Sequence, residues 1–154
     1  MLNAAILGAG AMGCLYASYL CKNPDLNLLL LDHKADKVDS INKNGLLMIE
    51  NDEEIRFNVP AKVSGHGRQE PVDILLIFVK AHQTYAALKA NRSLIGPKTV
   101  VVSLQNGMGN YLEIVKFVPL DRIVIGTSNH NSTLLGSGHF LHAADGKTII
   151  GAFS

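Results

Sequence analysis

The chain has 154 residues, 47% of them hydrophobic, and carries 14 basic and 13 acidic side chains for a formal net charge of +1. This length supports one ordinary domain with a hydrophobic core and is too short for two full-sized domains. The balanced charge excludes the basic surface that a nucleic-acid partner requires. The longest apolar runs, residues 28–31 and 74–79, are far shorter than the roughly 20 residues of a membrane-spanning helix. We therefore expect a soluble, cytoplasmic protein with no nucleic-acid or membrane partner.

Two kinds of pattern alternate along most of the chain. Short apolar runs predict strands at residues 3–7, 26–31, 72–79, 99–104 and 122–125. Helical spacing of apolar residues, together with helix-ending residues, predicts helices at residues 11–22, 35–43, 82–94 and 111–117. The runs ILLIFV and TVVV are apolar throughout, as is typical of parallel strands that are covered on both faces. The alternation predicts a Rossmann-like, doubly wound α/β fold with a mostly parallel sheet.

Turn residues interrupt this alternation in two places. Residues 46–49 and 55–59 flank Asn51-Asp52, which predicts a β-hairpin, and a polar loop (SGHGRQEP) follows it. Towards the C-terminus, short strands are separated by Gly136-Ser137-Gly138 and by Asp145-Gly146, both typical of hairpin turns. We therefore expect antiparallel strands at the C-terminal end of the sheet.

A glycine-rich segment lies between the first expected strand and the first expected helix. Gly8-Ala9-Gly10-Ala11-Met12-Gly13 fits the pattern G-x-G-x-x-G. In this context the first glycine permits a tight turn, the second lets the backbone approach a pyrophosphate, and the third lets the helix lie close to the strand. The helix N-terminus supplies N–H groups to the anion. We interpret the segment as a dinucleotide-binding loop, the alternative being a tight turn without a ligand.

Asp32 ends the second expected strand, 24 residues after Gly8, where a carboxylate can accept hydrogen bonds from the adenosine ribose, which favours NAD. His33 and Lys34 follow, and they could hold the 2′-phosphate of NADP. A like-charge contact at about 4 Å is unfavourable by roughly 4 kcal/mol before screening, which would exclude NADP if Asp32 points inward. If Asp32 instead caps the following helix, this penalty largely disappears. These residues alone leave both cofactors open.

Lys80 and Asn106 each follow one of two neighbouring expected strands. Ligands of open α/β sheets bind at this edge, so we expect the two side chains to be neighbours across a crevice. A lysine there can form a charged hydrogen bond worth about 1.5–3 kcal/mol with the carboxylate of a small acidic substrate. An amide can contact a cofactor hydroxyl and a substrate group together, and Gly107 and Gly109 would let the backbone pass close to the ligand. The alternatives are an ordinary cation at a helix start and an Asn-Gly turn.

The histidines and cysteines indicate no metal or redox centre. His139 and His142 are three residues apart in expected β structure and so face opposite sides, while His130 borders the expected crevice. Cys14 and Cys21 share one face of the first expected helix, about 10 Å apart along its axis, too far for a disulfide. We interpret both as small buried apolar side chains in a reducing compartment.

Several segments together resemble the ketopantoate reductase (2-dehydropantoate 2-reductase) family. They are GAGAMGCLYA at the start, VKAHQT at 79–84, LQNGMGN at 104–110 and IGTSNHNSTLLGSGHFLHAADGKTIIG in the tail. Members are NADP-dependent oxidoreductases that reduce 2-dehydropantoate, a small 2-oxo acid, to pantoate on the route to pantothenate and coenzyme A. They have an N-terminal Rossmann domain and a helical C-terminal domain, with the active site in the cleft between them.

The resemblance implies roles for individual residues. It assigns Gly8–Gly13 to the pyrophosphate, Lys80 to the cofactor, and Asn106 to both cofactor and substrate. Ser132 matches a position whose backbone touches the cofactor. One departure concerns the cofactor: NADP-using members commonly carry an arginine near the end of the second strand, where this chain has Asp32-His33-Lys34, so NAD is also possible.

The second departure concerns the catalytic groups. The family's proton-donating lysine and the polar residues that complete its site lie in the helical C-terminal domain, which this chain does not contain. We therefore expect residues 1–154 to be the NAD(P)-binding half of a two-domain enzyme, with no catalytic residue of its own and with exposed apolar surface that favours a homo-oligomer. Two alternatives remain: a related two-domain dehydrogenase of another 2-oxo acid, and a non-catalytic NAD(P)-sensing module.

Overall fold

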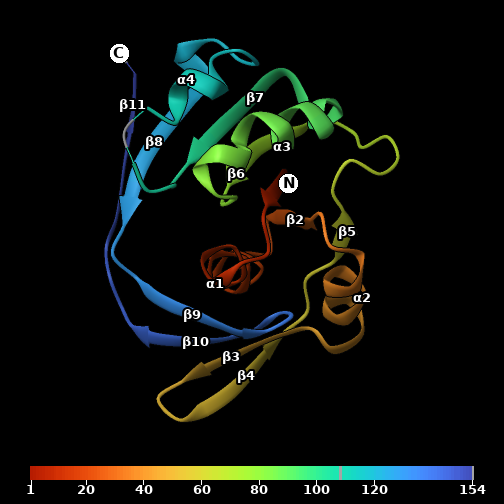
Figure 1. The fold of residues 1–154 in the computed structure, drawn as a ribbon, viewed down its shortest axis with the longest axis vertical. Helices are drawn as coiled ribbons and strands as arrows, with labels where there is room; N and C mark the ends of the chain where they lie inside the picture. The colour runs from red at the N-terminus through yellow and green to blue at the C-terminus, as the bar shows by residue number, and fades with distance from the viewer. Residues whose placement is uncertain (108, 154) are drawn as a thin grey trace.

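In the part of the chain that the structure describes, the main sheet is built from seven strands (Figure 1). The computed structural model describes residues 1–107 and 109–153, so Met108 of the LQNGMGN segment lies outside the described residues. The strands are β1 (Leu2–Leu7), β2 (Leu26–Asp32), β5 (Ala61–Val63), β6 (Val72–Ile77), β7 (Ile95–Ser103), β8 (Ile123–Ser128) and β11 (Thr148–Ala152). Their order is β11-β8-β7-β6-β1-β2-β5. The pairs are parallel except that β11 runs antiparallel to β8. The predicted Rossmann-like sheet with an antiparallel end is confirmed.

A second, four-stranded sheet was not predicted from the sequence. It consists of β3 (Leu46–Glu50), β4 (Glu53–Phe57), β9 (Asn131–Gly136) and β10 (His139–Ala144), in the order β4-β3-β10-β9. The hairpin at Asn51-Asp52 is confirmed, since both residues have positive φ angles, 52° and 62°, as a two-residue hairpin turn requires. The prediction for Asp145-Gly146 was wrong, because this segment carries the chain from β10 in one sheet to β11 in the other. The cause is the parallel pairing of β10 with the distant β3.

The helices differ from prediction mainly at their ends. They are α1 (Ala11–Leu20), α2 (Ala35–Asn44), α3 (Thr84–Ala90) and α4 (Tyr111–Ile114), with 3-10 turns at Ala81–Gln83, Arg92–Leu94 and Leu120–Arg122. The helix expected over 82–94 breaks after α3 because the buried Asn91 side chain bonds the Ala87 carbonyl, the Ser64 hydroxyl and the Gly65 N–H group. Such side-chain bonds to nearby polar groups compete with a continuous helix.

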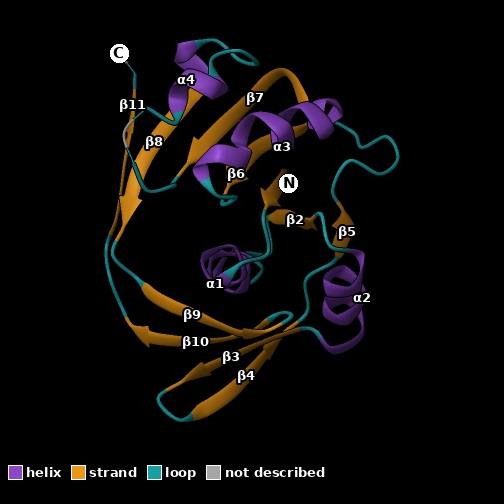
Figure 2. Cartoon of the chain, viewed as in Figure 1, coloured by secondary structure: helices purple, strands orange, loops and turns teal. Residues whose placement is uncertain are grey.

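The alternation of side chains along β1 divides the core into two parts. Ala4 and Ile6 pack with α1, α2 and the inner face of the second sheet, whereas Ala5 and Leu7 pack with α3 and α4 on the opposite face. Figure 2 shows α1 enclosed between the two sheets. Helices on both faces explain why the central strands are apolar throughout. Among the described residues, no helix has the length and apolar character needed to cross a membrane.

Candidate nucleotide-binding site

The three glycines of the first loop have different structural surroundings. Gly8 has a φ of 105°, and a Cβ there would lie 3.0 Å from the backbone of Phe78 and Val79. A Cβ on Gly13 would lie only 1.8 Å from the Gly8 carbonyl oxygen, so this glycine lets α1 approach the end of β1. No described heavy atom lies within 4 Å of a Cβ built on Gly10. Gly8 and Gly13 are therefore needed by the fold, whereas Gly10 borders open space that a ligand can enter.

The N-terminus of α1 faces the same space. Gly10 is its N-cap, and no described side chain makes a capping hydrogen bond there. The first intrahelical bond is from the Cys14 N–H group to the Gly10 carbonyl, so the N–H groups of Ala11, Met12 and Gly13 have no partner within the helix. Free N–H groups at a helix N-terminus bind anions. Residues 8–13 can therefore hold a pyrophosphate.

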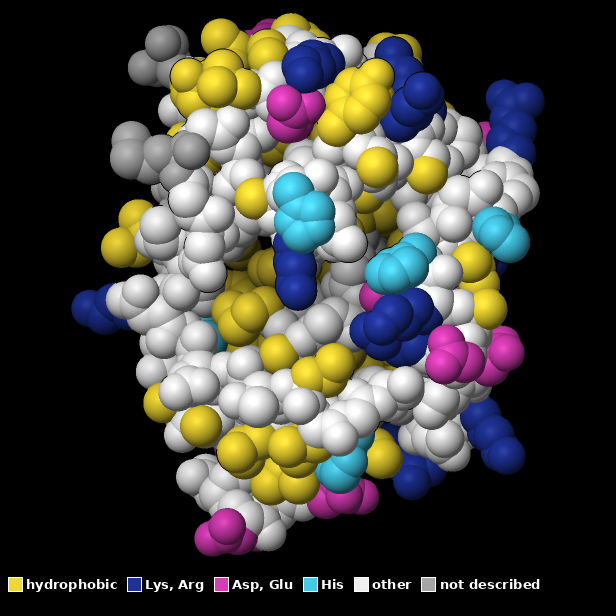
Figure 3. Space-filling view, in the orientation of Figure 1, with side chains coloured by type: hydrophobic (Ala, Val, Ile, Leu, Met, Phe, Trp, Pro, Cys, Tyr) yellow, Lys and Arg dark blue, Asp and Glu magenta, His cyan; other side chains and the backbone are white. Residues whose placement is uncertain are grey.

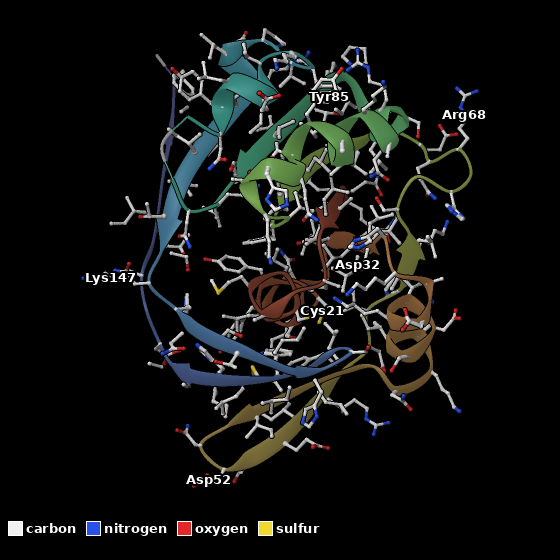
Figure 4. All side chains as sticks on the ribbon, viewed as in Figure 1. Cys21, Asp32, Asp52, Arg68, Tyr85 and Lys147 are labelled. Carbon is white, nitrogen blue, oxygen red and sulfur yellow. The ribbon has the colours of Figure 1, made fainter. Side chains whose placement is uncertain are left out.

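Asp32 lies at the end of β2, close to α1 in the interior of the molecule (Figure 4). Its side chain is 6% exposed. One carboxylate oxygen accepts a hydrogen bond from Ala9 N–H at 2.9 Å, and the other accepts from Lys34 N–H at 3.0 Å. The Lys37 ammonium lies 3.6 Å from the first oxygen. Asp32 therefore points inward and connects the glycine loop to the start of α2, whose N-cap is Lys34.

A hollow of about 220 Å³ adjoins Asp32 at the carboxyl ends of β1, β2 and β6. Its lining includes Gly8, Asp32, Ser64, Val79, Ala87 and Ala90. Apolar walls beside a carboxylate and a hydroxyl suit an adenosine group, whose base is flat and whose ribose offers hydroxyls. Ser64 and Ala87 were not predicted as site residues. The strand β5, which leads to Ser64, has only three residues and was not predicted either.

Lys80 and Asn106 occupy equivalent positions beyond two paired strands. In the register of β6 with β7, Ile77 pairs with Ser103, so each side chain follows its strand by the same three residues. Both are exposed at the carboxyl edge of the sheet. The register therefore places both residues at the same edge of the sheet. Among the described residues no hydrogen bond joins their side chains, and a shared ligand stays a prediction.

Gln105 holds these two strand ends together and was missed by the sequence reasoning. Its side-chain amide donates to the Val79 carbonyl at 2.6 Å and to the Thr84 hydroxyl at 2.8 Å. Its side-chain oxygen accepts from the Ser103 hydroxyl at 3.0 Å. These bonds fix the segment before Lys80 relative to the segment before Asn106. Its position next to Asn106 was the feature of the sequence that could have indicated a role for Gln105.

A larger hollow of about 600 Å³ opens beyond Asn106, a volume within the range of small-molecule sites. Its lining includes Asn106, Asn110, Tyr111, Ile125, Ile150 and Phe153. Figure 3 shows that the drawn face of the molecule is hollowed near its centre, with hydrophobic side chains inside and Lys or Arg and histidine side chains at the margin.

The remaining predicted residues lie beside or within α1 and at the start of α2. The Ser132 hydroxyl donates to the Ala11 carbonyl at 3.0 Å, which brings β9 beside the glycine loop. Lys34 is exposed. Cys14 is fully buried, and burial raises the pKa of its thiol to about 12, so it stays protonated and unreactive. Cys21, at the end of α1, is only partly buried, in contrast to the prediction, because the helix ends there at the surface.

Known proteins resemble this chain over almost its full length. A model of the family described as ketopantoate reductase PanE/ApbA matches residues 4–154. A 2-dehydropantoate 2-reductase of Halobacterium salinarum is 27% identical over 153 residues, which are 99% of this chain and 50% of that protein. Another, from Streptococcus pyogenes, is 32% identical over 133 residues, 86% of this chain and 42% of that protein.

Solved structures show the same relationship. A D-mandelate dehydrogenase with NADH and anilino(oxo)acetate has a TM-score of 0.88 and 31% identity, and the match covers 97% of this chain and 48% of that one. The chain thus spans about half the length of the relatives it matches.

Proposed function

Because the chain belongs to the ketopantoate reductase family, we propose that it forms the NAD(P)-binding half of an oxidoreductase that reduces a small 2-oxo acid, with 2-dehydropantoate as the first candidate substrate. The observation that carries the proposal is the open space at Gly10, flanked by the free N–H groups of α1 and by two strand ends that bear Lys80 and Asn106. The nucleotide supplies the hydride. Lys80 would attract the substrate carboxylate, and Asn106 would hydrogen-bond both the cofactor and the substrate.

We propose NADH as the preferred cofactor on the basis of Asp32. A carboxylate offers about four acceptor sites, and backbone N–H groups use two of them here, so ribose hydroxyls can occupy the others. The carboxylate points into the hollow beside Gly8, where a 2′-phosphate would meet a like charge. The D-mandelate dehydrogenase that resembles this chain carries NADH, which agrees with this preference.

NADP is the second candidate, and specific groups favour it. His33 is exposed and lines the hollow, and the next residue, Lys34, is also exposed. The Lys37 ammonium lies 3.6 Å from the Asp32 carboxylate. Together they could offset the charge of Asp32 and bind a phosphate. The family resemblance points the same way.

The substitution Asp32→Asn tests the cofactor preference. We expect the unaltered chain to bind NADH at least roughly tenfold more tightly than NADPH, and Asp32→Asn to reduce that ratio by about tenfold or more, because a like-charge contact is removed. Binding would be measured by titration of nicotinamide fluorescence. Asp36→Asn, at an exposed position in the first turn of α2, is the control and should leave the ratio unchanged. Tighter binding of NADPH by the unaltered chain would contradict the NADH proposal.

A turnover assay tests whether the 154-residue chain binds the nucleotide but needs further residues for catalysis. Reduction of a 2-oxo acid needs the nicotinamide and the keto carbon in reactive geometry, together with a positioned proton donor. The resemblance assigns that donor to residues beyond these 154. We expect the 154-residue chain to bind nucleotide while oxidising NADH or NADPH negligibly with 2-dehydropantoate. Robust turnover by this chain would refute the proposal that the proton donor lies outside these residues.

The same assay with the longer protein distinguishes the alternative functions. A panel of 2-oxo acids that includes 2-dehydropantoate and aryl 2-oxo acids would separate a ketopantoate reductase from a dehydrogenase of another acid. Nucleotide binding without turnover of any of them would favour the sensing module.

Sedimentation of the chain tests self-association, which the exposed Ile149 and Ile150 of β11 support. The free cysteines Cys14 and Cys21 support a reducing, cytoplasmic location.

A further inference from the structure

Two histidines lie close together beside α1, where the ring of His130 packs on Tyr16 and that of His142 packs on Tyr19. His130 lies in the connection from β8 to β9, and His142 lies on β10. His130 Nδ1 is 3.1 Å from His142 Nε2, and an Asp145 carboxylate oxygen is 3.6 Å from the same His142 nitrogen. The three donor atoms lie within 4.8 Å of one another. This cluster depends on β10 joining the second sheet, so residue spacing along the sequence does not indicate it.

The separation of these atoms suits a transition-metal ion. Two ligand atoms at about 2.0–2.1 Å from a tetrahedral Zn²⁺ are roughly 3.4 Å apart, close to the observed separation of the two ring nitrogens. The Asp145 side chain is 87% exposed and can turn its carboxylate toward the ion. Two imidazole nitrogens and one carboxylate oxygen are ligands that Zn²⁺ accepts, with the fourth position open to water.

A carboxylate contact holds one of the rings in the orientation that a ligand needs. His142 is 1% exposed, and its Nδ1 lies 2.6 Å from a Glu50 carboxylate oxygen, which also accepts a hydrogen bond from the Tyr19 hydroxyl at 3.0 Å. A proton on Nδ1 leaves the Nε2 lone pair facing His130. Metal-bound histidines almost always have such a carboxylate or carbonyl partner.

We propose that His130 Nδ1, His142 Nε2 and the Asp145 carboxylate bind a divalent transition-metal ion, with Zn²⁺ as the best match. The ion replaces the direct contact between the two rings and the long contact of 3.3 Å between Gly146 N–H and His130 Nδ1. It joins the β8–β9 connection to the β10–β11 connection, two of the connections that carry the described chain from one sheet to the other. Its role is structural.

Metal titration of untagged, EDTA-treated protein tests this site. We expect ZnCl₂ to bind at one ion per chain in calorimetry and to raise the melting temperature, and CoCl₂ to give the visible absorption of tetrahedral cobalt. His130→Gln and Asp145→Asn each remove a ligand and should weaken binding at least tenfold. Glu50→Gln should weaken it by about 10–100-fold, the effect typical of losing a partner that orients a ligand.

The controls are exposed residues of the same types outside the cluster. His82→Ala and Asp121→Asn should bind Zn²⁺ like the unaltered protein. Circular dichroism would show that each variant is folded, and the exposed Asp145 makes its variant the least disruptive of the set. The proposal is overturned if the unaltered protein shows no saturable binding, or if His130→Gln and Asp145→Asn bind as tightly as the controls.

Discussion

Gly13→Ala should destabilise the whole domain and abolish nucleotide binding. The new Cβ would lie 1.8 Å from the Gly8 carbonyl oxygen, which is backbone and cannot turn away as a flexible side chain can. The start of α1 must therefore move away from β1, and it carries the buried Cys14 and Leu15 with it. Forced overpacking of this kind costs about 3 kcal/mol or more, a large part of the stability of an ordinary domain.

Gly10→Ala is the matched substitution, and it should reduce nucleotide affinity strongly while changing stability little. Gly10 has a φ of −79° and a ψ of −169°, which alanine adopts without strain, and its Cβ would enter open space. We expect a loss of stability of about 1 kcal/mol or less, the cost of a poorer N-cap residue. Because the same space is where a pyrophosphate would lie, nucleotide affinity should still fall at least roughly tenfold.

Thermal unfolding and nucleotide titration of the two variants separate fold from function. Gly13→Ala should lose both properties, and Gly10→Ala should lose only binding. If Gly10→Ala binds NADH and NADPH as tightly as the unaltered chain, the space at Gly10 is not the pyrophosphate site. A melting temperature of Gly13→Ala close to that of the unaltered chain would show that α1 does not depend on its close approach to β1.

Local rules explain why so much of the main sheet could be predicted. The strands of the sheet core are apolar on both sides, since residues such as Ala4 and Ala5 belong to different halves of the core. The second sheet is different, because its central pair joins β3 to β10, roughly 90 residues apart, in parallel. No local turn indicates such a pairing. The break at Asn91 was equally hidden, since it depends on hydrogen bonds to a loop that only the fold brings near.

The positions of candidate site residues at strand ends could be predicted from the sequence. Those that depend on contacts between distant segments of the chain could not. Lys80 and Asn106 follow paired strands, so the sheet edge alone places them together. Asp32 was correctly placed at the edge, but the choice between its two orientations needed the bond to Ala9 N–H. His130 and His142 could be related only through the second sheet. The role of Gln105 could not be predicted either, because its amide donates to Val79 and Thr84, which follow a different strand.

Gln105→Ala should weaken both the fold and the binding of the nicotinamide end. The substitution leaves the Val79 carbonyl, the Ser103 hydroxyl and the fully buried Thr84 hydroxyl without their amide partner. An unsatisfied buried polar group costs about 1–3 kcal/mol, and water can reach part of this site, so we expect a loss of roughly 2–3 kcal/mol. The ends of β6 and β7 can then move apart, which separates Lys80 from Asn106.

Gln105→Glu distinguishes positioning from simple loss of packing. Glutamate keeps the shape of glutamine but replaces the donor by a carboxylate, which would face the Val79 carbonyl instead of bonding to it. If the amide positions the strand ends, affinity for the nucleotide should fall at least as far with glutamate as with alanine. The control is Gln69→Ala, which should change neither stability nor affinity. Among the described residues, the Gln69 side chain accepts a single long hydrogen bond, at 3.4 Å from the ammonium of the exposed Lys62. Normal nucleotide binding by folded Gln105→Glu would show that the amide only fills space, because a carboxylate of the same shape would then serve as well.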